Sequence, residues 1–130
     1  MADAAVFNLA AVTVLKNSEW FRDMSDELLR EIAALSSQRR YGEGELVFAR
    51  DTPGDYLYGV IAGSIRVTTM APDGRELALN TMHAGEVIGE IAVLDGGLRT
   101  ASGHALEPTT VFLVPREHFT ALMLRQPSVA

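Results

Sequence analysis

Apolar positions in the first 36 residues recur with the period of an α-helix. The first run ends at Asn17-Ser18, and its predicted buried face consists of Val6, Leu9, Ala10 and Val14. A second helix is predicted to begin after Ser25, because Ser is a favoured N-cap and acids follow it in the first turn. The predicted buried face of this helix consists of Leu28, Leu29, Ile32 and Leu35. The pattern therefore predicts two N-terminal helices, of which the second packs against the elements that follow.

From Gln38 the pattern changes to short β-rich runs punctuated by glycine. The runs are R-R-Y-G-E-G-E-L-V-F-A-R, D-Y-L-Y-G-V-I-A-G-S-I-R-V-T-T-M, R-E-L-A-L-N-T-M and T-V-F-L-V. Between two of them, A-P-D-G-R predicts a hairpin turn, because Pro fixes φ and Gly accepts a positive φ. Residues 116–125 return to a helical pattern. Many short strands separated by Gly and Pro turns predict a mainly β fold, a jelly roll or β-sandwich with flanking α-helices, rather than an α/β fold.

The composition narrows the functional classes. The chain has 130 residues, 48% hydrophobic and 22% charged, which fits one folded domain. Its formal net charge of −6 argues against a broad basic surface, so we expect no direct nucleic-acid binding by this segment. The absence of cysteine excludes thiolate catalysis, Cys-based metal sites and disulfides.

No membrane association is expected, because charged residues interrupt every apolar run before it reaches the length of a membrane span. At the N-terminus, Asp3 stands where a signal peptide carries positive charge. Residues 1–17 are therefore interpreted as a cytoplasmic N-terminal helix or arm, and the protein is expected in the cytoplasm.

Candidate catalytic residues do not form a recognisable site. His83, His104 and His118 are scattered, without the spacing that metal ligands need. No serine lies in a G-x-S-x-G elbow, and G-E-G at 42–44 is interpreted as a turn between strands. We therefore expect a non-enzymatic protein without a metal or a resident cofactor.

The stretch V-I-G-E-I-A-V-L-D-G-G-L-R-T-A-S, residues 87–102, places one acid and one base in a mostly apolar segment. A short helix predicted to begin near Glu90 would present the free N–H groups of Ile91 and Ala92 to an anion. Arg99 can add a bidentate fork suited to phosphate, and Thr100 a hydroxyl and an N–H. Glu90 can accept the hydroxyl of a sugar. Together these groups indicate a nucleotide site.

A structural alternative remains open at this point. Glu90 and Arg99 can instead pair with each other as a buried salt bridge across the Gly96-Gly97 turn. Such a pair contributes little net stability in many proteins, so the residues alone leave the two interpretations close.

The same stretch resembles the phosphate-binding cassette of cyclic nucleotide-binding domains, commonly written F-G-E-[LI]-A-L-x(3,4)-P-R-[AT]-A. The upstream segment G-D-Y-L-Y-G-V-I-A-G-S-I is similar to the family's G-[DE]-x(4)-[YF]-x-[IV]-x-x-G-x-[IV] core. The resemblance covers roughly residues 18–126, beyond the arm at 1–17. It implies a β-roll of the jelly-roll type that binds cAMP or cGMP.

Roles in the site follow from the resemblance. It implies that Glu90 accepts the ribose 2′-hydroxyl and that Arg99 pairs with the cyclic phosphate. The remaining groups implied to surround the ligand belong to Gly89, Ile91, Ala92, Thr100 and Ala101.

The sequence departs from the family pattern at three positions. Leu98 stands for Pro, Ile88 for Phe, and Asp51 for a Gly, where Asp tolerates a positive φ better than most residues. None of these changes removes a ligand group. Thr100 is compatible with both cAMP and cGMP, and the bacterial character of the chain favours cAMP.

The chain ends before the long helix that caps the base in this family, and no helix-turn-helix follows. The resemblance therefore implies a cAMP sensor module from a bacterial transcription regulator of the catabolite-regulator type, with its output domain absent from this chain and a homodimer possible in the full-length protein. Two alternatives remain: a jelly-roll dimerisation or protein-interaction module that binds no nucleotide, and the regulatory domain of a channel or an enzyme.

Overall fold

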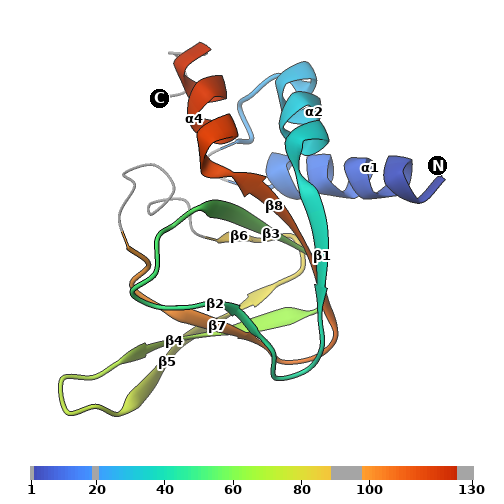
Figure 1. Ribbon diagram of the computed structural model, residues 1–130. Helices are drawn as coiled ribbons and strands as arrows, with labels where there is room; N and C mark the ends of the chain where they lie inside the picture. Colours follow the sequence, from blue (N-terminus) through green and yellow to red (C-terminus); the bar gives the residue numbers. More distant parts are fainter. Residues whose placement is uncertain (1, 19–20, 89–97, 126–130) are drawn as a thin grey trace.

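The computed structural model describes residues 2–18, 21–88 and 98–125, and shows three helices gathered on one side of a β-roll (Figure 1). The helices are α1 (Ala2–Lys16), α2 (Asp26–Leu35) and α4 (Arg116–Arg125). The strands are β1 (Ser37–Tyr41), β2 (Leu46–Phe48), β3 (Tyr56–Ala62), β4 (Ser64–Met70), β5 (Glu76–His83), β6 (Val87–Ile88), β7 (Ser102–Ala105) and β8 (Thr109–Pro115). The predicted mainly β fold with flanking helices is confirmed.

Eight strands form two four-stranded sheets in the described parts of the chain, with antiparallel pairing throughout. One sheet has the order β1-β8-β3-β6 and the other β2-β7-β4-β5. Strands distant in sequence are neighbours in both sheets, so the chain winds between the two layers in the manner of a jelly roll. The β4–β5 hairpin projects from the roll on the side away from the helices (Figure 1).

The predicted helix and turn signals act as expected at four places. Ser25 caps α2, where its Oγ accepts a hydrogen bond of 3.2 Å from the Leu28 N–H. The A-P-D-G-R segment closes the β4–β5 hairpin, and Gly74 has a φ of 90° there. Helix α4 covers the predicted residues 116–125 and begins directly after β8. The G-E-G segment is the turn between β1 and β2, and Gly44 has a positive φ of 84°.

The predicted buried faces of the helices are partly wrong. Val14 is buried as predicted, but Leu9 is 70% exposed and Ala10 is half-buried, whereas Ala11 and Leu15 are buried without having been predicted. The side chain of Val6 lies outside the described residues. Because apolar residues surround much of α1, its periodicity does not single out one stripe. In α2 the buried residues include Leu28, Leu29 and Ile32, as predicted, whereas Leu35 in the last turn is 41% exposed.

Two hydrophobic clusters lie on opposite faces of the sheet β1-β8-β3-β6. The helix-side cluster joins α1 and α2 to the outer face of this sheet through Leu57, Phe112 and Val114. The roll interior lies between the sheets, and its buried residues are Tyr41, Val47, Phe48, Tyr58, Val60, Ile65, Val67, Ala101, Ala105, Val111 and Leu113. Alternation along β3 explains the division, because Leu57 and Tyr58 point to opposite faces.

Candidate functional site

The predicted site is only partly within the described residues. Gly89, Glu90, Ile91 and Ala92, together with the predicted short helix and the Gly96-Gly97 turn, lie outside them. Arg99, Thr100 and Ala101 lie inside them, on the segment that leads into β7. The contact of Glu90, with a nucleotide or with Arg99, therefore stays a prediction, and the described part of the site is the side that carries Arg99.

The backbone at Arg99 is held by the segment that follows β2. The Arg99 N–H donates to the Thr52 carbonyl, and the Asp51 N–H donates to the Arg99 carbonyl, both at 2.8 Å. An antiparallel bridge between Pro53 and Leu98 extends this pairing. Asp51 adopts a φ of 65°, which confirms the left-handed conformation expected where the family has Gly. The positive φ turns the chain at the point where it meets Arg99.

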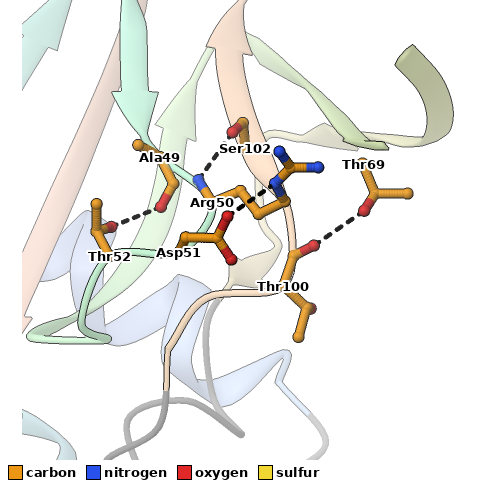
Figure 2. A network of polar contacts seen from close by, with 7 residues as sticks. All are labelled: Ala49, Arg50, Asp51, Thr52, Thr69, Thr100 and Ser102. Atoms are coloured by element: carbon orange, nitrogen blue, oxygen red, sulfur yellow. Dashed lines mark hydrogen bonds and ion pairs between the residues drawn. The ribbon is translucent and has the colours of Figure 1, made fainter. Parts of the chain in front are cut away.

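Further polar contacts hold the residues that follow Arg99 in place (Figure 2). The Arg50 N–H donates to Ser102 Oγ at 2.8 Å, and Arg50 Nε lies 3.3 Å from the Asp51 carboxylate. On the other side, Thr69 Oγ1 of β4 donates to the Thr100 carbonyl at 3.0 Å. The residue pair Arg99-Thr100 is therefore held by the segment that follows β2 and by β4, which precede it in sequence by about 30 to 50 residues.

The Arg99 side chain is buried in the roll interior, although it is charged. Arg99 is only 6% exposed, and its guanidinium carbon lies 4.9 Å from the centroid of the Phe48 ring and 5.0 Å from that of Tyr58. Arg99 Nη2 donates to the Tyr56 carbonyl at 2.5 Å. None of the ion pairs within residues 9–18, 21–88 and 98–118 involves Arg99. Among the described residues, the guanidinium of Arg99 thus contacts two aromatic rings and one backbone carbonyl.

Burial shifts the ionisation of both partners in this contact. Loss of solvent lowers the pKa of Arg99, opposed by the nearby Tyr58 and Asp55. Loss of solvent also raises the pKa of Tyr58, opposed chiefly by the Arg99 charge. Since an arginine in a protein stays protonated, the site presents a fixed positive charge beside a neutral phenol. A cation in such a low-dielectric setting interacts strongly with an anion.

Thr100 and Ala101 take different positions beside this cation. Thr100 is exposed, whereas Ala101 is 9% exposed and belongs to the roll interior. The structure therefore brings Arg99 and Ala101 to the interior and leaves Thr100 at its margin.

Sequence reasoning missed the partners of Arg99, which are the rings of Phe48 and Tyr58 and the carbonyl of Tyr56. These residues come from β2 and β3, far from the 87–102 stretch in sequence. The alternation Y-L-Y at 56–58 signals that the two tyrosines share one face of a strand. Only the sheet pairing shows that this face meets Arg99.

No group of three or more His, Asp and Glu side chains is arranged to hold a metal ion within the described part of the chain. Across the same residues, no helix is both long and apolar enough to cross a membrane.

Comparison with known proteins gives a consistent match. The family model for the cyclic nucleotide-binding domain matches residues 38–126. The CRP-like cAMP-activated global transcriptional regulator of Mycobacterium tuberculosis is 32% identical over 102 residues, which cover 76% of this chain and 46% of that protein. The cyclic AMP receptor protein of Thermus thermophilus is 33% identical over 116 residues, which cover 89% of this chain and 54% of that protein.

A solved structure extends the match to three dimensions. The N-terminal domain of a transcriptional regulator from Streptomyces coelicolor superposes with a TM-score of 0.80 at 32% identity, covering 89% of this chain and 83% of that one. The chain spans about half the length of the two curated relatives that it matches.

Proposed function

The chain belongs to the cyclic nucleotide-binding domain family, and we propose that it is a non-enzymatic sensor that binds a cyclic nucleotide, cAMP in preference to cGMP. The observation that carries this proposal is the buried Arg99 guanidinium, held by two aromatic rings and the Tyr56 carbonyl. A buried charge is costly unless it is paired. The cyclic phosphate is an anion of the right shape for a guanidinium fork.

Each predicted site residue receives a role in this proposal. Arg99 pairs with the phosphate, and Thr100 offers its N–H and hydroxyl at the exposed margin of the same place. Glu90 accepts the ribose 2′-hydroxyl. Backbone groups of Gly89, Ile91 and Ala92 complete the phosphate cradle, and Ala101 packs below it. The preference for cAMP is supported by the names of two relatives, which describe them as cAMP-activated and as a cyclic AMP receptor.

The wider role is proposed from the same relatives. We propose that residues 18–126 form the sensor module of a cytoplasmic transcription regulator, with 1–17 as a flanking helix and a separate output domain that contacts DNA. Dimerisation is proposed for the full-length protein. Ligand binding would act as a population shift, because it favours the conformation in which both Glu90 and Arg99 contact the nucleotide. The helices packed on the β-roll would then report that conformation to the output domain.

Calorimetric titration of the purified chain with cAMP, cGMP and 5′-AMP tests the proposal. We expect cAMP to bind more tightly than cGMP, and 5′-AMP to bind weakly because its phosphate has a different shape and charge. Thr100→Ala should widen the difference between the two cyclic nucleotides, because the Thr100 hydroxyl can reach the guanine amino group of cGMP and cAMP has no amino group at that place. A chain that shows neither heat of binding nor thermal stabilisation with either cyclic nucleotide would contradict the proposal and favour an interaction module, since a specific ligand must stabilise the native state.

A further inference from the structure

The Arg99 guanidinium lies over two neighbouring aromatic rings, and we infer that these rings, from Phe48 and Tyr58, are positioning residues that orient it toward its anion. The two rings are here called the aromatic floor. Their centroids are 5.7 Å apart and their planes are inclined by 35°. The guanidinium carbon lies 4.9 Å from the Phe48 centroid and 5.0 Å from the Tyr58 centroid. Both distances fall within the range of a cation–π interaction. The inference rests on the proposed function, because it concerns the same site.

The inferred orientation leaves the edges of the guanidinium available. All five N–H groups of an arginine lie in the plane of the fork, so rings that attract the cation from above that plane do not occupy these donors. Among the described contacts, one N–H is used by the Tyr56 carbonyl. The other donors of the fork can therefore meet a phosphate without breaking the contacts that hold it.

Strand β3 supplies two of the three groups that set this orientation. Tyr58 provides one ring of the floor, and Tyr56, two residues earlier, provides the carbonyl. Phe48, at the end of β2, provides the other ring. Because β2 and β3 are each hydrogen-bonded into a sheet, the orientation of the guanidinium is determined by rigid elements rather than by a loop.

An aromatic floor suits an anion site better than a carboxylate does. A carboxylate partner would neutralise the guanidinium and compete with the ligand for its donors. Aromatic rings attract the cation through their quadrupole but carry no net charge. The buried Arg99 is thus held in place while its positive charge stays available to the phosphate.

The first test measures the orientation without any nucleotide. In a proton–nitrogen NMR spectrum, the Arg99 Nε–H signal, assigned by its loss in Arg99→Lys, should be shifted by the ring currents of the floor. Tyr58→Leu should return this signal toward the position of exposed arginines, and Tyr58→Phe should keep it. An unshifted Arg99 signal in the wild-type protein would overturn the inference.

The second test measures cAMP affinity by calorimetry in the same variants. Tyr58→Leu should weaken binding about tenfold, the size expected from loss of one strong ring contact, while Tyr58→Phe binds like the wild type. Leu57→Ala is the matched control, because Leu57 lies on the same strand but faces the helix-side cluster. Thermal unfolding of each variant separates loss of folding from loss of binding.

The outcomes distinguish this inference from the proposed function. If Tyr58→Leu binds as tightly as Leu57→Ala, or Tyr58→Phe binds as weakly as Tyr58→Leu, the floor does not position Arg99 for the ligand. If the wild-type chain binds no cyclic nucleotide, the proposed function fails, and the NMR signal alone decides whether the floor orients the guanidinium.

Discussion

The two faces of the sheet β1-β8-β3-β6 differ in what they bury. The outer face packs against α1 and α2 in the helix-side cluster, and none of the buried residues described on these two helices is charged. The inner face borders the roll interior, which contains an apolar cluster of its own but also accommodates the Arg99 guanidinium over Phe48 and Tyr58. The same four strands thus separate a packing surface from a surface that holds a charge.

This difference implies that stability and ligand binding can be changed separately. Burial of apolar area is the dominant favourable contribution to folding, and the helix-side cluster provides such burial. The roll interior includes a cation whose burial is costly, and a ligand anion recovers that cost. Changes on the outer face should therefore lower the free energy of unfolding, whereas changes around Arg99 should lower affinity.

The largest loss of stability is expected from Leu29→Ala on α2. Leu29 is fully buried in the helix-side cluster, so its truncation removes apolar contacts and leaves a cavity. The expected decrease in the free energy of unfolding is about 2–5 kcal/mol. Urea unfolding measures it, with Arg30→Ala on the exposed side of the same helix as the control. If cAMP affinity of the folded variant fell together with its stability, the two faces would not be independent.

A smaller loss of stability is expected from Gly59→Ala in β3. A Cβ added at residue 59 would overlap the ring of Phe112, which is fully buried on the outer face. Overpacking of this kind costs about 1–3 kcal/mol. Phe112→Leu in the Gly59→Ala background should recover part of the loss, which thermal unfolding can measure. A neutral Gly59→Ala variant would show that the outer face is packed less closely than described.

The smallest effect is expected from Thr69→Val, and it should appear in affinity. The Thr69 hydroxyl donates to the Thr100 carbonyl, and its loss frees the segment next to Arg99 at a cost of about 0.5–1.5 kcal/mol. Thr13→Val on α1 is the matched control, because the Thr13 hydroxyl donates to the Leu9 carbonyl at the same distance of 3.0 Å. Calorimetry should show weaker cAMP binding for Thr69→Val alone. Equal binding by both variants would show that Thr69 does not support the site.

The sequence predicted most of the fold because its signals are local. The Ser25 cap, the A-P-D-G-R turn and the final helix each depend on a few adjacent residues, and all three were found where predicted. The orientation of α1 was not predictable in the same way. Its apolar residues lie on several sides, so only contact with α2 and β3 decides that Leu15 is buried and Leu9 exposed.

The sequence predicted the charged residue of the site, Arg99, but not the residues that surround it. The isolated Arg99 in an apolar stretch indicated an anion partner, and the structure places it in the roll interior. Phe48 and Tyr58 could not be linked to it from the sequence, because their proximity depends on pairing between strands far apart in the chain. Glu90 lies outside the described residues, so its role stays a prediction.

The most direct test of the account is a calorimetric titration of cAMP into the wild-type chain, Arg99→Ala and Arg66→Ala. Arg66 is the matched control, because it is an exposed arginine of β4 that pairs with Glu76 at 3.4 Å. Far-ultraviolet circular dichroism and cooperative thermal unfolding confirm that each variant is folded. We predict that Arg99→Ala weakens binding by about 2–5 kcal/mol, as expected for loss of a buried charge partner, and that Arg66→Ala binds like the wild type. Binding by Arg99→Ala as tight as that of the wild-type chain would contradict the assignment of Arg99 as the phosphate partner.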